Sequence, residues 1–77
     1  MKHHRLDTVV LDRDLPEHGL CRGDLGAVVE DYEPDSVAVE FVRASGNTQA
    51  VVTLPENHVR PVRDSDRIAV RSVEQAA

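Results

Sequence analysis

The sequence predicts an all-β fold, a small and partly open barrel of five short strands. Runs of four to six residues rich in β-branched side chains alternate with clusters of turn-forming residues. No uninterrupted stretch of helical length precedes residue 64. A chain of 77 residues has room for one domain with a small core. A sheet of five short strands buries its apolar face best by curling on itself, which also removes exposed edges.

The first predicted strand, Asp7–Leu11, is dense in β-branched residues. A loop follows, because Pro16 lacks an N–H and Gly19 tolerates a positive φ. Leu15 and Leu20 flank this loop, and we expect them to fold back and plug one end of the barrel.

A tight turn bracketed by Gly23 and Gly26 leads into the second strand, Ala27–Tyr32. We expect both glycines to be required where the backbone bends sharply. Asp24 between them is placed to accept a hydrogen bond from the N–H groups of its own turn. The breaker residues Glu33–Ser36 form the next turn.

The third strand, Val37–Val42, shows the clearest alternation, with apolar side chains on one face and Ala38 and Glu40 on the other. The predicted core is Val37, Val39, Phe41, Val9 or Val10, Val28 or Val29, Val52 and Leu54.

A hairpin loop over 43–49 precedes a fourth strand, Ala50–Leu54, whose ladder Pro55 ends. Residues 56–58 form at most one helical turn before the closing strand, Val59–Val62.

The remaining tail admits three structures. Asp64–Asp66 is a potential cap for a helix whose Ala69, Val73 and Ala77 share one stripe. Arg67–Val73 also contains β-branched residues at the alternation of a strand. A frayed, disordered tail is the third possibility, and the last four residues are expected to be loose in every case.

The composition argues against several functions. The formal net charge is −5, which disfavours nucleic acid, because lysine and arginine must neutralise phosphates there. Tyr32 and Phe41 are the only large aromatic residues, too few for a base-stacking platform. No apolar run has the length of a membrane span, and no signal-peptide region follows the N-terminus. A single cysteine indicates a soluble protein of the reducing cytoplasm.

Metal binding and catalysis find little support. Zinc sites need short ligand spacings in ordered elements, and no such spacing joins His3, His4, His18 and His58. Cys21, with His18 and Arg22 nearby, is a conceivable nucleophile. A nucleophile also needs an oriented base and an oxyanion hole, which this sequence does not supply. We therefore expect no metal, no cofactor and no enzymatic activity.

Acidic residues are concentrated in the first half of the chain. Residues 12–35 contain eight acidic side chains and only two arginines, Arg13 and Arg22. Such asymmetry concerns partners and steering. The residues expected to bind a partner are Asp12, Asp14, Glu17, Glu30, Asp31 and Glu33.

The pattern over residues 6–62 resembles a bacterial family of domains of unknown function that are small SH3-like barrels. The residues that carry it are Asp7–Leu11, Asp14–Leu20, Gly23–Val29, Val39–Val42, Thr53–Leu54 and Val59–Val62. The resemblance implies fold, bacterial origin and a role as a small accessory or binding module, with no catalytic residues to transfer. Residues 1–5 then form a flexible N-terminus, and residues 63–77 form an extension outside the pattern.

These observations favour a non-catalytic protein-interaction module that docks a basic protein partner. The antitoxin, immunity or accessory half of a two-protein bacterial system fits this description. The alternative is a ribosome- or nucleic-acid-associated barrel, suggested by the Gly-x-x-Gly-x-Val segment that begins at Gly23.

Overall fold

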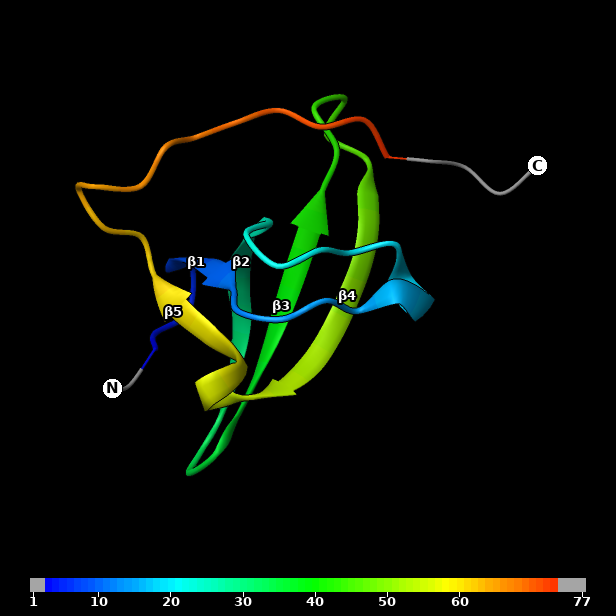
Figure 1. Ribbon diagram of the computed structural model, residues 1–77. Coiled ribbons are helices and arrows are strands. Elements are labelled where there is room, and N and C mark those ends of the chain that lie inside the picture. Colours follow the sequence, from blue (N-terminus) through cyan, green and yellow to red (C-terminus); the bar gives the residue numbers. More distant parts are fainter. Residues whose placement is uncertain (1–2, 74–77) are drawn as a thin grey trace.

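The computed structural model describes residues 3–73, which form one antiparallel sheet (Figure 1). Its strands are β1 (Thr8–Leu11), β2 (Leu25–Tyr32), β3 (Ser36–Val42), β4 (Thr48–Pro55) and β5 (Val59–Pro61). Two short 3₁₀ turns lie between strands, η1 (Pro16–His18) and η2 (Glu56–His58). Within residues 3–73 there is no α-helix. The predicted all-β fold with five strands is confirmed, and each strand boundary lies within two residues of its predicted place.

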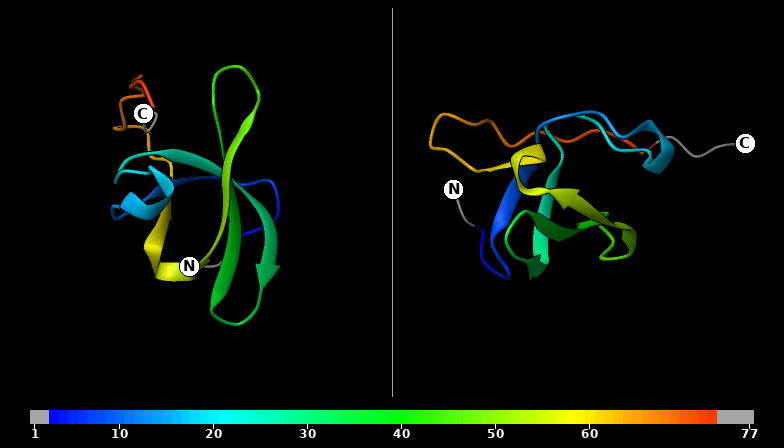
Figure 2. Two further views of the ribbon diagram at one scale, coloured as in Figure 1. Left: turned by 90° about the vertical axis from the view of Figure 1, so that its right-hand side faces the viewer. Right: turned by 90° about the horizontal axis from the view of Figure 1, so that it is seen from below.

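The strand order β4-β3-β2-β1-β5 explains why the sheet curls. The two edge strands, β4 and β5, are joined only by the three residues of η2. In a flat sheet these edges would be about 19 Å apart, at about 4.8 Å per strand spacing. The four Cα steps from Pro55 to Val59 reach about 15 Å even when fully extended. The sheet must therefore bend round, although β4 and β5 do not pair and the barrel stays open (Figure 2).

A bulge in β2 reverses which residues face the core. Val28 lies opposite Val39, but the next paired residue is Glu30, so Val29 has no partner on β3. Such a bulge bends the strand and increases its twist. Beyond it Asp31 lies opposite the buried Val37, while Glu30 points to the outer face of the sheet.

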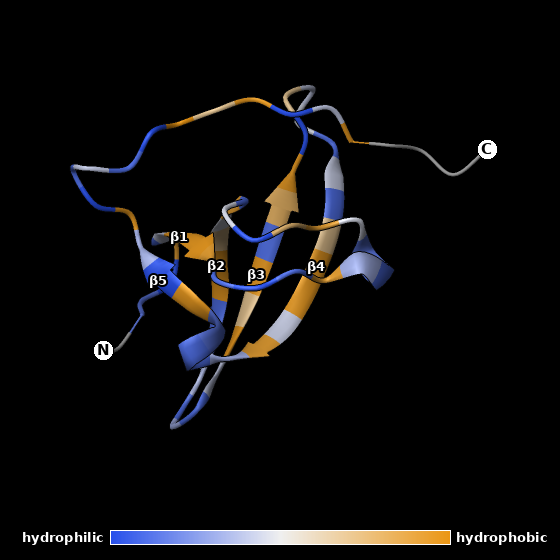
Figure 3. Cartoon of the chain, in the orientation of Figure 1, coloured by the Kyte–Doolittle hydropathy of each residue, from blue (hydrophilic) through white to orange (hydrophobic). Residues whose placement is uncertain are grey.

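The core is aliphatic with one aromatic ring, and it matches the prediction closely. The buried apolar residues are Val9, Val10, Leu11, Leu20, Val28, Val37, Ala38, Val39, Phe41, Leu54 and Val59. Val52 is only partly buried against this cluster. Leu15 also packs on it and forms a bridge with Leu20, as the loop-plug hypothesis requires. In Figure 3 the hydrophobic colour runs along β1 and β3.

The two glycines after the first loop have different roles. Gly23 has a φ of +97° and is the turn residue that the sequence predicts. The expectation for Gly26 is wrong, because this residue is buried inside β2 and has no positive φ. It is small because the side chains of Val39 and Phe41 on β3 occupy the space that a Cβ atom would need, a contact that a single sequence does not reveal.

The tail also differs from two of its predicted forms. Residues 62–73 form neither the predicted helix nor the predicted strand, but run without regular secondary structure. In Figure 1 this segment leaves β5 and passes back across the molecule. The expected loose last four residues lie outside the described residues, as do residues 1–2 of the N-terminus, whereas His3 is buried.

Candidate functional site

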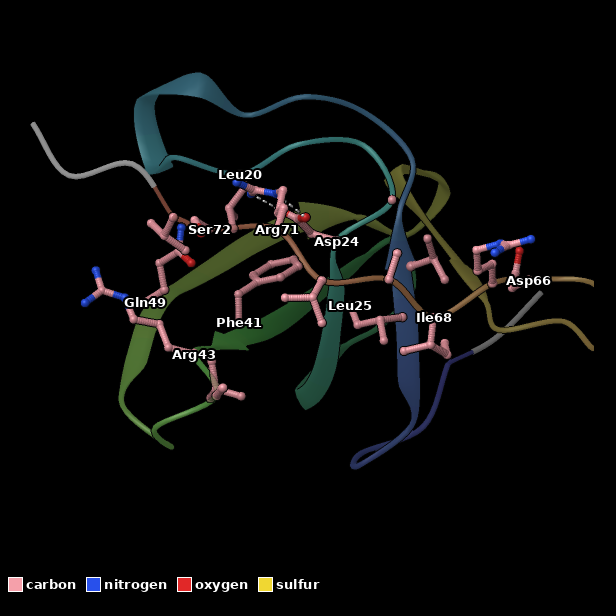
Figure 4. Close-up of a pocket in the computed structure, with 18 of the residues that line it drawn as sticks. Leu20, Asp24, Leu25, Phe41, Arg43, Gln49, Asp66, Ile68, Arg71 and Ser72 are labelled. Carbon is pink, nitrogen blue, oxygen red and sulfur yellow. Dashed lines mark hydrogen bonds and ion pairs between the residues drawn. The ribbon is translucent and has the colours of Figure 1, made fainter.

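A groove with a volume of about 600 Å³ lies between three segments far apart in the chain. One wall comes from the β1–β2 loop (residues 12–24), and another from the start of the β3–β4 hairpin loop. The third comes from residues 66–73, which we call the strap. Its apolar lining includes Leu20, Leu25, Phe41 and Val42. Figure 4 shows Leu25 and Phe41 alongside the strap.

The strap begins at a two-pronged ion pair. Arg60 of β5 donates from Nη1 to Asp66 Oδ2 and from Nη2 to Asp66 Oδ1, both at 2.9 Å. The amide N–H of Arg63 donates to the same Oδ2 at 2.7 Å. The hydrogen bonds from Arg60 and Arg63 lower the pKa of Asp66 to about 2. This turn fixes the direction in which the chain leaves β5.

A second arginine holds the strap to the β1–β2 loop. Arg71 donates from Nε to Asp24 Oδ1 at 2.9 Å and from Nη2 to Asp24 Oδ2 at 2.5 Å. The same Nη2 donates to the carbonyl oxygen of Gly19 at 3.0 Å. Asp24 also accepts a 2.8 Å hydrogen bond from the amide of Cys21, which precedes the turn that the sequence predicts as the source of the donor. Figure 4 shows Arg71 and Asp24 facing each other.

Charge and burial act in opposite directions on Asp24. Burial alone would raise the pKa of Asp24, but its hydrogen bonds from Arg71 and Cys21 outweigh burial and lower it. The hydrogen bond to Asp24 in turn raises the pKa of Arg71. The Asp24 side chain is 19% exposed and that of Arg71 is 39% exposed. The pair is therefore charged at neutral pH and partly shielded from water.

Between its two anchors the strap makes little apolar contact. Ile68 is 65% exposed and Val70 is fully exposed. Within residues 3–73, no backbone hydrogen bond joins the strap to the sheet. The strap is therefore held to the groove by polar anchors rather than by packing.

The first three acidic residues expected to bind a partner lie together in the β1–β2 loop. Asp12 and Asp14 are engaged with Arg22, whose Nη2 is 3.1 Å from Asp12 Oδ1. The Arg22 amide donates to Asp14 Oδ1 at 2.8 Å. Glu17 is exposed on η1. Two of these three carboxylates therefore stabilise the loop itself.

The other three lie at the far end of β2. Glu30 and Asp31 are near the end of this strand, and Glu33 lies in the turn that follows. β2 has eight residues and, at about 3.3 Å per residue, separates its two ends by about 23 Å. The structure therefore divides the six acidic residues into two groups and does not gather them on one surface.

The histidines and the cysteine are also dispersed. Among residues 3–73 no group of three His, Cys, Asp or Glu side chains is placed to hold a metal ion. The Nδ1 atom of His58 is buried without a hydrogen-bond partner. Burial, assisted by the charge of Arg13, lowers the pKa of His58. Cys21 is an exposed free thiol.

Sequence reasoning missed the residues that build the groove. Asp24 was predicted only as a turn residue, and Arg71 as part of the tail. The two are 47 positions apart, and neither has a local pattern that indicates the other. The Gly23–Gly26 segment marked the place of Asp24 but not its partner.

Within the described residues there is no helix long and apolar enough to cross a bilayer.

Comparisons with known proteins cover the five strands of the sheet but not the strap. Neither the comparison with curated proteins nor that with solved structures found a match. The model of a family described as a domain of unknown function, DUF4926, matches residues 5–61, most of the chain, and the protein therefore belongs to this family.

Proposed function

We propose that this protein is a non-catalytic interaction module that docks a basic protein partner. The observation that carries the proposal is the end of the β2–β3 hairpin. Its acidic side chains are Glu30, Asp31, Glu33 and Asp35, and residues 25–42 contain no lysine or arginine. We call these four residues the acidic hairpin end. The hairpin end projects away from the barrel as a hydrophilic tip (Figure 3).

The bulge in β2 distributes these charges around the tip. Glu30 lies on the outer face of β2, and Tyr32 shares that face. Asp31 lies on the opposite face. Tyr32 is 51% exposed, and tyrosine is enriched among residues that anchor protein interfaces. An exposed aromatic ring that shares a strand face with the carboxylate of Glu30 suits a partner surface that presents lysine or arginine.

The acidic residues of the β1–β2 loop have a different part in this proposal. Asp12 and Asp14 already engage Arg22. We assign Asp12, Asp14 and Glu17 to long-range steering of a basic partner rather than to direct contact.

The proposal also includes the type of barrel and the kind of system in which the protein acts. The order of the strands, with β5 returning to β1 after the 3₁₀ turn η2, supports an SH3-like barrel. Small size and asymmetric charge support the antitoxin, immunity or accessory half of a bacterial two-protein system in the cytoplasm.

The test begins with a pull-down of the tagged protein from its own cells, followed by association kinetics with the captured partner. In the double variant Glu30→Lys/Glu33→Lys we expect the association rate to fall about tenfold and its salt dependence to flatten. The control Asp64→Lys changes the net charge away from the hairpin and away from the three steering residues, and per unit of charge it should have a much smaller effect. Equal effects of the two variants per unit of charge, or none from either, would refute docking at the acidic hairpin end.

A further inference from the structure

The groove under the strap contains a preformed receptor for a guanidinium group. Its three acceptors are both carboxylate oxygens of Asp24 and the carbonyl oxygen of Gly19. Planar, two-pronged recognition of this kind suits arginine, whereas a lysine ammonium is a point charge that cannot match the fork.

These acceptors are held in place without help from the strap. The amide of Cys21 fixes Asp24 Oδ2 at 2.8 Å. Gly19 has a left-handed φ of 68° at the end of η1. Gln49 of β4 donates from Nε2 to the carbonyl oxygen of Gly19 at 3.1 Å. The acceptors therefore have partners in the loop and in β4 besides Arg71, and we expect them to stay in place when Arg71 leaves.

The strap is an incomplete occupant of this groove. Leu25 and Val42 line the groove but remain 38% and 55% exposed. Ile68 and Val70 of the strap also line the groove but leave these two side chains partly exposed, and they are themselves exposed. Because Arg60 and Asp66 secure the start of the strap, Arg71 can leave while the barrel and the strap's origin stay intact.

We propose that this groove binds an extended, arginine-bearing segment of a partner protein, and that the strap occupies the site through Arg71 until such a segment displaces it. The incoming arginine takes the three acceptors of Arg71, and apolar side chains beside it cover Leu25 and Val42. This site goes beyond the proposed function, because it lies at the opposite end of β2 from the acidic hairpin end.

The strap is part of the same chain as the groove. Arg71 therefore competes with an external arginine for the three acceptors at a high local concentration. A tethered ligand of this length acts at millimolar effective concentration. The apparent affinity for an external segment falls by the fraction of molecules in which the site is open. Removal of Arg71 should therefore increase the affinity for an external segment without altering the receptor.

The experiment uses full-length protein and a fluorescein-labelled synthetic peptide with the sequence of residues 66–73, measured by fluorescence anisotropy. We expect Arg71→Ala protein to bind this peptide at least about tenfold more tightly than wild type does. The control Arg67→Ala removes an exposed arginine of the same strap for which no ion pair is seen within residues 3–73, and it should bind like wild type. A peptide with lysine in place of Arg71 should bind more weakly. Adding Asp24→Asn to Arg71→Ala should abolish binding, while the asparagine oxygen can still accept the Cys21 amide.

Three results would overturn the proposal. The first is equal peptide affinity of the wild-type and Arg71→Ala proteins, and the second is binding that survives Asp24→Asn. The third is a wild-type dimer in sedimentation velocity that Arg71→Ala dissociates, which would assign the groove to the strap of a second copy.

If the Arg71→Ala protein unfolds at a much lower temperature than wild type, the test uses ¹⁵N-labelled wild-type protein and excess peptide instead. Amide resonances of Gly19 and Leu25 that do not shift on addition of the peptide would then also overturn the proposal. The Glu30→Lys/Glu33→Lys variant should bind the peptide like wild type, so the two proposals fail independently.

Discussion

At Gly26 the absence of a side chain lets β2 approach the core strand β3. A Cβ atom built there would lie 2.5 Å from Val39 Cγ1 and 2.9 Å from Phe41 Cε1. It would also lie 3.1 Å from the carbonyl oxygen of Glu40, a backbone atom that cannot rotate away. Both side chains are in the core, so relief of these contacts requires the core to repack.

Gly26→Ala should therefore destabilise the protein by about 1–3 kcal/mol, the usual cost of overpacking a core. Urea unfolding measures the change in free energy, and the ring resonances of Phe41 report the displacement. The comparison variant is Gly23→Ala, where nothing lies within 4 Å and only the positive φ is strained. It should cost roughly 1–2 kcal/mol without shifting Phe41. A Gly26→Ala protein with wild-type stability would show that β2 and β3 are farther apart.

At the scale of elements, the strap depends on the pair of Arg60 and Asp66. The pKa of Asp66 is about 2, below its usual 3.8. A carboxyl group with a lowered pKa stabilises the folded state at pH values above its unfolded pKa. That stabilisation is lost as pH falls from about 4 towards 2, because in this range the unfolded protein binds a proton at Asp66 while the folded protein does not yet do so.

Asp66→Asn should therefore lower the thermal midpoint at pH 7, and its difference from wild type should shrink as pH falls from about 4 to 2. Hydrogen exchange of the Arg63 amide, which donates to Asp66, should quicken in the variant at pH 7. Asp64→Asn, an exposed neighbour, serves as the control. Parallel pH profiles for the wild-type and Asp66→Asn proteins between pH 4 and 2 would contradict this role.

The elements also show which features a sequence can predict. The β3 strand was predicted from alternation alone, because its buried face and its period are both local properties. The bulge at Val29 was missed, since it depends on how β2 pairs with β3. The strap was missed for the same reason: Arg71 meets Asp24 only after the sheet has curled. The sequence shows that acidic residues are concentrated in the first half of the chain. It does not show that β2 separates them into one group in the β1–β2 loop and another at its far end.

At the scale of the whole molecule, two features disfavour binding to nucleic acid: the net charge of −5 and the pairing of arginines with carboxylates. Arg22, Arg60 and Arg71 are all paired with carboxylates of the same chain. In each pair the carboxylate already neutralises part of the guanidinium charge, so the arginine attracts a phosphate less strongly than a free one would. The number of cations that can neutralise a nucleic-acid backbone is therefore smaller than the composition implies.

We therefore expect no binding of labelled single- or double-stranded DNA or RNA at about 150 mM salt, with anisotropy unchanged up to tens of micromolar protein. Non-specific nucleic-acid binders typically have dissociation constants of about 10⁻⁴ to 10⁻⁶ M at this salt concentration. Arg71→Ala frees the carboxylate of Asp24 and should make binding less favourable still, whereas Glu30→Lys/Glu33→Lys tests whether the acidic hairpin end repels the nucleic acid. Micromolar binding by wild type that weakens steeply with added salt would report counterion release. That result would favour the ribosome- or nucleic-acid-associated alternative over a module that docks a basic protein.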